Sequence, residues 1–222
     1  MRKIILVLAV ILPQPLKQFL YRTLLKWKIG RGVKIGYSYL DAVSIELGDG
    51  VSIGHFNVVR GVRRFSVGAG TYIANFNEFF GDGGFYKDFA SRLEIGRDVR
   101  LMSHHFIDVG GVVTIGDRTT VGERDTHFWS HTRTLYSGVP KLEPTIVTIG
   151  ADVYIGARAT FVGCSIPDGA VVGAGSIVSK HFAPEDQRLL IAGNPATIKK
   201  RYDAAPAEPG INAANEDGVE RR

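Results

Sequence analysis

Aliphatic residues followed by glycine recur along most of the chain, at intervals of about six residues. The most regular stretch runs from Val147 to Lys180 and contains Ile149-Gly150, Ile155-Gly156 and Val172-Gly173. A six-residue period fits neither the 3.6-residue repeat of an amphipathic helix nor the two-residue alternation of a half-buried strand. It is typical of a parallel β-helix, in which aliphatic side chains point into the coil and the following glycine allows the chain to turn.

The same pattern extends far upstream of this stretch. The upstream pairs are Ile35-Gly36, Leu47-Gly48, Ile53-Gly54, Val67-Gly68, Ile95-Gly96, Ile115-Gly116 and Val121-Gly122. A single coil does not bury its own apolar face, so stability comes from stacking coil on coil. The pattern therefore predicts an all-β fold, a parallel β-helix of hexapeptide repeats.

The repeat and its flanks divide the 222 residues into four segments. We predict the β-helix over residues 31–183, preceded by an apolar and then amphipathic helical segment and followed by a return segment and a polar tail. These flanking segments are residues 1–30, 184–202 and 203–222. The tail contains few large apolar side chains, and we expect it to be flexible.

The six-residue period stops twice within the coil. The first interruption lies between Asn75 and Ile95, and the second runs from Thr132 to Thr145. An interruption of this kind predicts a loop that leaves a corner of the coil. Loops on a rigid scaffold often carry binding groups.

A frame slip is expected just before the second loop. His127 falls where an inward aliphatic residue is due, but the neighbouring Phe128 is better suited to fill the coil. We therefore predict a slip of one residue, which places His131 at the point where the coil gives way to the loop.

The N-terminal segment carries two basic residues and then nine apolar ones, residues 4–12. Nine residues are too few to span a bilayer, and no A-x-A cleavage pattern follows, so we expect a cytoplasmic protein that is not exported. From Pro15 to Trp27 the apolar residues fall at helical spacing, with Arg22 and Lys26 off that face. This helix could place residues 1–27 against the cytoplasmic face of a membrane, or it could cap the open end of the coil stack.

The overall charge is basic, with 27 Lys and Arg against 22 Asp and Glu and a net charge of +5. The basic residues are scattered, with no aromatic-interleaved stripe, so we expect no nucleic-acid partner. A polyanionic small ligand or an anionic membrane surface fits the charge equally well. The single cysteine, Cys164, excludes a disulfide within the chain and offers no CxxC pair for zinc, and we expect it to be a small buried filler.

The hexapeptide coil, a histidine beside a loop, and the runs GAGSIVSK and IAGNPATIKK together resemble the hexapeptide-repeat acyltransferases, and among them the galactoside and maltose O-acetyltransferase group. The likeness covers about residues 45–200. It implies a left-handed parallel β-helix, a homotrimer, acetyl-CoA as co-substrate, a carbohydrate acceptor and no required metal. The short basic start and the FWSHT sequence resemble the branch that modifies surface polysaccharides or their lipid-linked precursors.

In that family a histidine at this place takes the proton from the acceptor hydroxyl, which then attacks the thioester of acyl-CoA. The matching residue is His131, in FWSHT. Imidazole suits this task because its pKa lies near the operating pH. His127 is the alternative, and geometry decides between the two.

The resemblance also implies cofactor contacts. Ala157, in YIGAR, matches a position whose backbone N–H faces the thioester carbonyl, and Ala174 matches a backbone contact to the pantetheine arm. Ser179 and Lys180 match residues that meet the cofactor, and Lys200 matches a basic residue at its nucleotide end. Thr197 replaces an arginine of the galactoside group, so the charge at the nucleotide end rests on Lys199, Lys200 and Arg201, which could instead be a solvated basic stretch.

Three further residues are candidates for contact with the acceptor. Asn75 matches an asparagine that contacts the acceptor sugar, and Asp82 falls where the family has an aspartate near the acceptor. Trp129, beside His131, is expected to form a wall of the acceptor or pantetheine slot. The alternative for Asn75 is a coil-corner asparagine that bonds only to backbone.

Other functions fit the same coil. The leading hypothesis is an O-acetyltransferase acting on a sugar hydroxyl, and N-acetylation of an amino sugar and a non-catalytic β-helix scaffold are the alternatives. The γ-carbonic anhydrases hold zinc with a histidine pair five residues apart, whereas His127 and His131 are four apart, which argues against that class.

Overall fold

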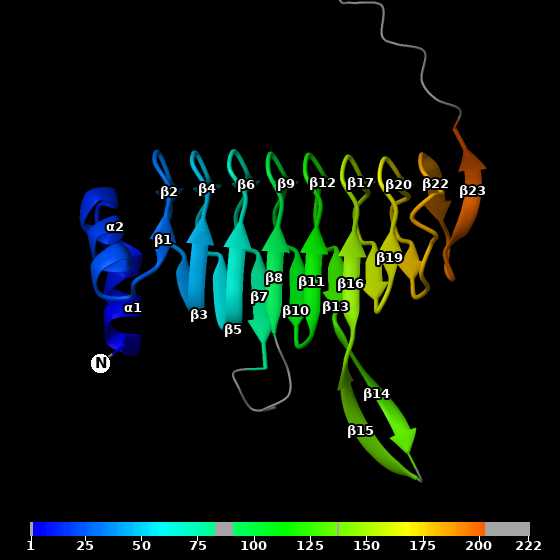
Figure 1. Cartoon of the computed structure of the whole chain (residues 1–222), viewed down its shortest axis with the longest axis horizontal. Coiled ribbons are helices and arrows are strands. Elements are labelled where there is room, and N and C mark those ends of the chain that lie inside the picture. Colours follow the sequence, from blue (N-terminus) through cyan, green and yellow to red (C-terminus); the bar gives the residue numbers. More distant parts are fainter. Residues whose placement is uncertain (1, 83–90, 137, 203–222) are drawn as a thin grey trace, which may run out of the picture.

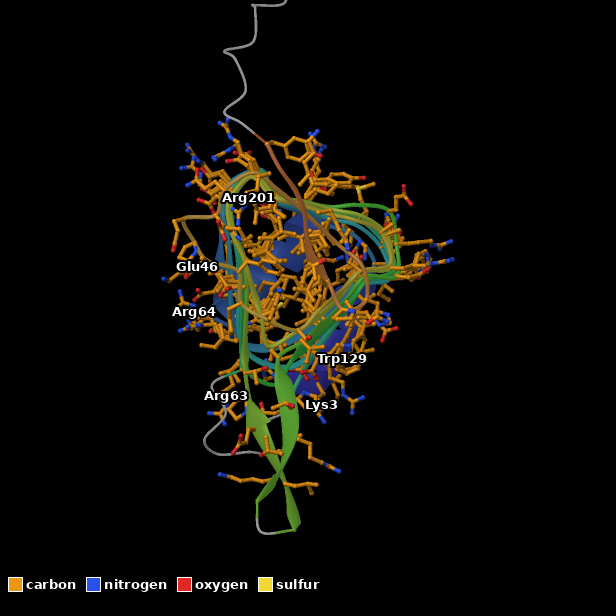
Figure 2. All side chains as sticks on the ribbon, turned by 90° about the vertical axis from the view of Figure 1, so that its right-hand side faces the viewer. Lys3, Glu46, Arg63, Arg64, Trp129 and Arg201 are labelled. Carbon is orange, nitrogen blue, oxygen red and sulfur yellow. The ribbon has the colours of Figure 1, made fainter. Side chains whose placement is uncertain are left out.

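The computed structural model describes residues 2–82, 91–136 and 138–202. These residues form a stack of parallel coils, with two helices at one end and a hairpin that projects from one side (Figure 1). Seen along the stack, the coils outline a triangle (Figure 2). A parallel β-helix is therefore the architecture, as the six-residue period predicted.

One face of the triangle is a nine-stranded sheet. Its strands are β2 (Lys34–Ile35), β4 (Ser52–Ile53), β6 (Tyr72–Ile73), β9 (Arg100–Leu101), β12 (Thr120–Val121), β17 (Tyr154–Ile155), β20 (Val171–Val172), β22 (Leu189–Ala192) and β23 (Thr197–Arg201). The order follows the chain because each coil adds one strand. Only the last pair, β22 and β23, is antiparallel.

A twelve-stranded sheet forms the other two faces, and β3 and β5 run over both of them. Its strands are β1 (Lys28–Ile29), β3 (Tyr39–Leu47), β5 (Val58–Val67), β7 (Glu78–Gly81), β8 (Arg92–Ile95), β10 (Phe106–Val109), β11 (Val112–Ile115), β13 (His127–Trp129), β16 (Ile146–Ile149), β18 (Thr160–Val162), β19 (Ser165–Ile166) and β21 (Ile177–Val178).

Inward side chains stack in register from coil to coil. One column pairs Phe79 with Ile107, Phe128, Phe161 and Val178 in turn, and each of them is at most 1% exposed. The aromatic members stack directly: the ring centroids of Phe128 and Phe161 are 4.9 Å apart at 15°. Since inward positions have neighbours above and below, every aliphatic or aromatic residue there extends a continuous core.

The predicted frame slip is confirmed. Phe128 is buried in the column just described, whereas His127 is only half-buried. The extra residue lies in the preceding corner, which spans residues 122–126 between β12 and β13, whereas the next coil needs only residues 156–159. Two residues of the longer corner, Glu123 and Asp125, have φ of 54° and 61°, a conformation that turns the chain tightly.

The N-terminal segment contains two helices, α1 (Arg2–Ile11) and α2 (Gln14–Thr23). The amphipathic helix therefore ends four residues before the expected Trp27. Side chains of α2 donate to carbonyl groups of the first coil: Lys17 to Ile35 and Gly36 at 3.0 and 2.8 Å, and Gln18 to Val33 at 2.7 Å. Because these groups have no preceding coil to pair with, α2 closes the open end of the stack.

The two interruptions differ from each other. The coil continues through β7 to Gly81, so the first loop is shorter than the expected gap between Asn75 and Ile95. The second loop is an antiparallel hairpin of β14 (His131–Tyr136) and β15 (Val139–Pro144). The coil also passes the predicted end at residue 183, because β22 pairs with β20 in parallel. The predicted tail, residues 203–222, lies outside the described residues.

None of the described helices is both long enough and apolar enough to cross a membrane.

Candidate active site

The three corners of the coil form three edges along the stack. We call the edge that carries the β14–β15 hairpin the hairpin edge; it includes Gly61, Asp82, Gly110, His131 and Lys180. The edge at which the nine-stranded face meets β7, β10, β13 and β18 is called the aromatic edge, after the exposed rings of Tyr37, Phe56 and Phe76. It also includes Asn75, Ala157 and Ala174. The two edges border the face formed by β7, β10, β13, β18 and β21.

His131 lies on the hairpin edge as the first residue of β14. The register that pairs Phe80 with Asp108 and Asp108 with Trp129 brings Asp82, Gly110 and His131 to successive coils. The His131 side chain is 29% exposed, so its ring lies at the surface of the edge and not inside the prism. A ring at this place is accessible to a substrate.

Asp108 holds the His131 ring. Its Oδ1 atom lies 2.6 Å from Nδ1 of His131, and the Asp108 side chain is only 16% exposed. A carboxylate only accepts hydrogen bonds, so in the neutral imidazole Nδ1 carries the proton and Nε2 carries the free lone pair. The pair therefore presents a base whose tautomer and orientation are fixed.

The corner beneath this pair is tightly hydrogen-bonded. The buried hydroxyl of Ser130 donates to the carbonyl oxygen of Asp108 at 2.7 Å and accepts from the backbone N–H of Gly111 at 2.9 Å. Asp108 Oδ1 also accepts from the N–H of Gly110 at 3.1 Å. These bonds fix both the strand that carries the carboxylate and the strand that carries the imidazole.

Gly110 leaves room for the pair. A Cβ at this position would lie 3.2 Å from Nδ1 of His131 and 3.3 Å from Oδ1 of Asp108. Its neighbour Gly111 is more constrained, because a Cβ there would lie 2.1 Å from the carbonyl oxygen of Thr145. Close approach of the backbone thus requires glycine at position 111, whereas a side chain at position 110 would press against the His131–Asp108 pair.

Trp129 stands beside the imidazole. Its ring centroid lies 6.2 Å from that of His131 at 82°, and 5.1 Å from that of Phe106. The indole is half-buried and forms part of the surface around His131. His127 also contacts Trp129 edge-on at 6.4 Å, but it has no carboxylate partner among the described residues. Geometry therefore favours His131 over His127 as the base.

The aromatic edge presents backbone N–H groups. In the early coils these amides are occupied: His55 N–H donates to Oδ1 of Asn75 at 2.7 Å, and Asn75 N–H to Oγ of Ser103 at 3.2 Å. At the same edge, the N–H groups of Ala157 and Ala174 have no hydrogen-bond partner within the described part of the chain. They are donors available to a ligand.

The remaining predicted cofactor residues divide between two places. Ser179 and Lys180 follow β21 on the hairpin edge, and the Lys180 ammonium lies 5.0 Å from the Phe182 ring centroid. Lys200 is exposed on β23, and its ammonium lies 4.8 Å from the Tyr202 ring centroid. One chain therefore does not gather all the predicted cofactor residues around His131.

The predicted acceptor residues are also separated. Asp82 is half-buried on the hairpin edge, two coils from His131, which corresponds to about 10 Å at the usual strand spacing. Asn75 lies on the aromatic edge, where its side chain accepts from the His55 backbone, the role considered as its alternative. Its contact with an acceptor stays a prediction.

Asp108 is the site residue that the sequence did not reveal. It lies at an outward position of its strand, one coil before Trp129. Finding it requires knowing that residues 106–109 stack on residues 127–130, and the extra corner residue obscures this spacing.

No group of three histidine, cysteine, aspartate or glutamate side chains is arranged to hold a metal ion within residues 2–82, 91–136 and 138–202.

Comparison with known proteins identifies the repeat. Residues 146–180 match the family described as hexapeptide repeat of succinyl-transferase. Over this stretch the chain is similar to the hexapeptide-repeat acyltransferases. The matched residues run from β16 to β21, and the free amides of Ala157 and Ala174 lie among them.

Two curated relatives extend the match. The chain is 31% identical over 198 residues to the bifunctional protein GlmU of Azoarcus sp. (strain BH72), covering 78% of this chain and 42% of the relative. It is 29% identical over 121 residues to WbbJ of Escherichia coli (strain K12), which is described as a lipopolysaccharide biosynthesis O-acetyl transferase, covering 52% of this chain and 60% of the relative. The chain spans less than two thirds of the length of the curated relatives that it matches.

A solved structure confirms the fold. The polysialic-acid-specific acetyltransferase NeuO superposes with a TM-score of 0.56 at 21% identity, covering 82% of this chain and 86% of NeuO.

Proposed function

We propose that this chain is an acetyl-CoA-dependent O-acetyltransferase that transfers an acetyl group to a sugar hydroxyl in surface polysaccharide or glycan biosynthesis. The observation that carries the proposal is the pair of His131 Nδ1 and Asp108 Oδ1 at 2.6 Å on an exposed edge of the coil. A histidine oriented by a carboxylate is the usual form of a general base that activates a hydroxyl.

In the proposed reaction Nε2 of His131 removes the proton from the acceptor hydroxyl as its oxygen attacks the thioester carbonyl carbon. The negative charge that develops on the carbonyl oxygen is stabilised by a backbone donor, and the N–H of Ala157 is the candidate. The intermediate collapses, the C–S bond breaks, and the thiolate of CoA takes the proton back from His131. Asp108 stabilises the imidazolium between these two steps.

His131 and Ala157 lie on different edges of one chain, with a whole face of the prism between them. The two groups therefore act on one thioester only if the hairpin edge of one copy faces the aromatic edge of another. This separation supports the homotrimer that the family resemblance implies. The left-handed winding of the coil is proposed from that resemblance alone. Acetyl-CoA would then lie between copies, against Ala157, Ala174, Ser179, Lys180 and Lys200.

The proposal is tested by His131→Ala, with His127→Ala as the matched control. The two histidines lie before and after Trp129 and both contact it, but only His131 has the carboxylate. Thiol release from acetyl-CoA is measured with a panel of neutral sugars, acidic sugars and amino sugars. We expect His131→Ala to lower kcat by at least about a hundredfold, as for loss of a general base, with His127→Ala within a few-fold of the unaltered protein. Transfer that survives in His131→Ala within a few-fold disproves the mechanism.

N-acetylation of an amino sugar is the second candidate, and the same assay decides it. Acetyl esters release the acetyl group to hydroxylamine, whereas amides do not. A product whose acetyl group resists hydroxylamine therefore shows that the protein is an N-acetyltransferase and not an O-acetyltransferase. Failure to bind CoA at millimolar concentration instead favours a non-catalytic scaffold.

Peripheral contact of residues 1–27 with a membrane is part of the same proposal. Helix α1 exposes four large apolar side chains to solvent: Ile4, Val7, Leu8 and Ile11 are 53% to 71% exposed. Apolar residues at this spacing on a helix that is too short to span suit contact with a membrane surface.

A further inference from the structure

A second site lies on the hairpin edge, beneath helix α1. It is a hollow of about 580 Å³ between α1, β3 and β5. Arg2 and Lys3 line it from the helix, and Arg60 and Arg63 line it from β5. Asp41 is the one acidic residue among the described residues of its lining, where it faces four cations.

The backbone creates this hollow. The pairing of β3 with β5 shifts between Asp41 and Ala42, which leaves Gly61 as an extra residue at the corner. Gly61 adopts φ of 70°, a conformation that glycine accepts without strain. A bulge of this kind bends the strand and redirects its side chains, and such bulges are frequent beside binding sites. Here the bulge at Gly61 lies between Arg60 and Arg63, which both line the hollow.

Two of the four cations that line the hollow, Lys3 and Arg60, carry a charge that no carboxylate of the described residues neutralises. Arg2 pairs with Asp41 and also donates to the carbonyl oxygen of Ala42 at 2.6 Å, so this acid is already occupied. The Asp41 carboxylate also accepts from the Tyr39 hydroxyl at 3.5 Å. Lys3 and Arg60 are exposed and have no ion-pair partner among the described residues. An anion placed between them would relieve their mutual repulsion.

The chemistry of the lining favours phosphate. Guanidinium groups bind the oxygens of a phosphate through paired N–H donors, and an ammonium group adds a point charge. The hollow and His131 lie on the same edge of the stack. Gly61 lies three coils before Ser130, the residue next to His131, which corresponds to about 14 Å at the usual strand spacing. Viewed along the stack, Lys3, Arg63 and Trp129 all lie around the corner that carries the hairpin (Figure 2).

We propose that the hollow beneath α1 binds a phosphate or diphosphate group of the acceptor, while a sugar of the same molecule reaches His131. This inference rests on the proposed acetyltransferase function and narrows its substrate class. The separation exceeds the reach of one sugar ring with its phosphate. The acceptor is therefore a phosphate-linked glycan of more than one sugar.

Binding is tested first, without catalysis, using inorganic pyrophosphate as the probe and calorimetry as the readout. CoA is present at saturating concentration, so that pyrophosphate does not occupy the place of the CoA diphosphate. The variant is Arg60→Ala, and the matched control is Arg64→Ala, a nearby arginine that pairs with Glu46 at 3.7 Å outside the hollow. We expect Arg60→Ala to weaken pyrophosphate binding about tenfold or more, as for loss of a charge-assisted hydrogen bond, with Arg64→Ala unchanged within twofold.

Vesicles distinguish the two sources of the phosphate. If the protein sediments with phosphatidylglycerol vesicles, and if both added pyrophosphate and Arg60→Ala reduce this binding, the phosphate is lipid-linked. Pyrophosphate binding without vesicle binding supports a soluble phosphorylated glycan. Absence of pyrophosphate binding, or binding that Arg60→Ala does not weaken, overturns the proposal.

The two proposals fail separately. If pyrophosphate binding depends on Arg60 but the protein shows no transferase activity, the anion site stands and the proposed acetyltransferase function is rejected. If Arg60→Ala leaves acetyl transfer unchanged with every phosphorylated and unphosphorylated acceptor, the proposed acetyltransferase function stands and the proposed phosphate site is rejected.

Discussion

At the scale of single residues, the geometry around His131 depends on a few close contacts. The imidazole is held by one carboxylate, that carboxylate by one glycine N–H, and the two strands by one serine hydroxyl. The histidine and serine contacts join neighbouring coils that are 23 and 22 residues apart in the sequence, and the glycine contact is local. Changing one atom of this set should therefore alter the chemistry while leaving the coil folded.

Asp108→Asn gives the most specific test of this set. An amide in place of the carboxylate keeps the shape but favours the wrong imidazole tautomer and no longer stabilises the imidazolium. We expect kcat to fall by at least about tenfold with little change in the KM for acetyl-CoA, following the behaviour of other oriented histidine bases. Steady-state kinetics with thermal unfolding as a control measures this. A fall in kcat that merely follows a fall in melting temperature contradicts the positioning role.

His105 provides a prediction about pH. The ring is 1% exposed, and burial lowers the pKa of His105 from its usual 6.5 to about 4. Its Nδ1 accepts from the N–H of Thr126 at 3.2 Å, which requires the neutral form. As the pH falls from 6.5 toward 4, the unfolded chain takes up a proton that the folded chain refuses, so stability contributed above pH 6.5 is lost.

The expected loss is about 3 kcal/mol in the free energy of unfolding by pH 4. Urea unfolding at pH 7 and pH 4.5 measures it, with His105→Gln as the variant and His127→Gln as the control. The dependence on pH should be weaker in His105→Gln alone. Equal slopes in all three proteins would refute this assignment.

At the scale of elements, α2 acts as a lid on the first coil. Lys17 is 1% exposed. Its ammonium donates to the carbonyl oxygens of Val10, Ile35 and Gly36 at 2.8 to 3.1 Å. Burial lowers the pKa of Lys17, yet the three acceptors compensate the ammonium. This one side chain joins both helices to the coil.

Lys17→Met keeps the apolar stem and removes all three hydrogen bonds. The carbonyl groups left without a donor should cost about 1–3 kcal/mol in the free energy of unfolding. Lys28→Met, at an exposed pair with Glu46, is the control and should change stability little. Urea unfolding gives both values. An increase in stability for Lys17→Met would mean that the cost of burying the ammonium exceeds what its bonds return.

The elements also separate what the sequence predicts from what it does not. The coil was predictable because each inward position, such as Ile155, takes an apolar residue wherever it falls, and this requirement is local. The position of His131 where the coil gives way to the second loop was predictable from the frame slip, whereas its role came from the family resemblance and stays a proposal. Asp108 was not predictable, because its partner depends on how long the corner at residues 122–126 is. The end of the coil was misplaced because β22 joins the sheet after a stretch without the repeat.

At the scale of the whole molecule, the proposed site needs two copies of the chain. Its base lies on the hairpin edge and its amide donors lie on the aromatic edge. An assembly that closes around three copies creates three equivalent sites, each made from two chains. This arrangement makes a prediction about mixtures of inactive chains.

His131→Ala chains lack the base but retain the aromatic edge, and Ala174→Trp chains block that edge but retain the base. Each protein alone should be inactive. Random trimers of equal amounts, formed by refolding the mixture, should recover about a quarter of the unaltered activity, because most trimers are mixed and each mixed trimer has one intact site. Acetyl transfer by the mixture measures this. A mixture as inactive as its components would place the whole site within one chain.

Both ends of the stack are stopped, one by α2 and the other by the antiparallel β23. Open sheet edges recruit further strands, and the last strand of the nine-stranded sheet, β23, instead presents the exposed Lys199 and Lys200, whose like charges disfavour pairing with a second copy. These two elements disfavour growth of copies along the stack axis. Association flank to flank is the direction that brings two unlike edges together.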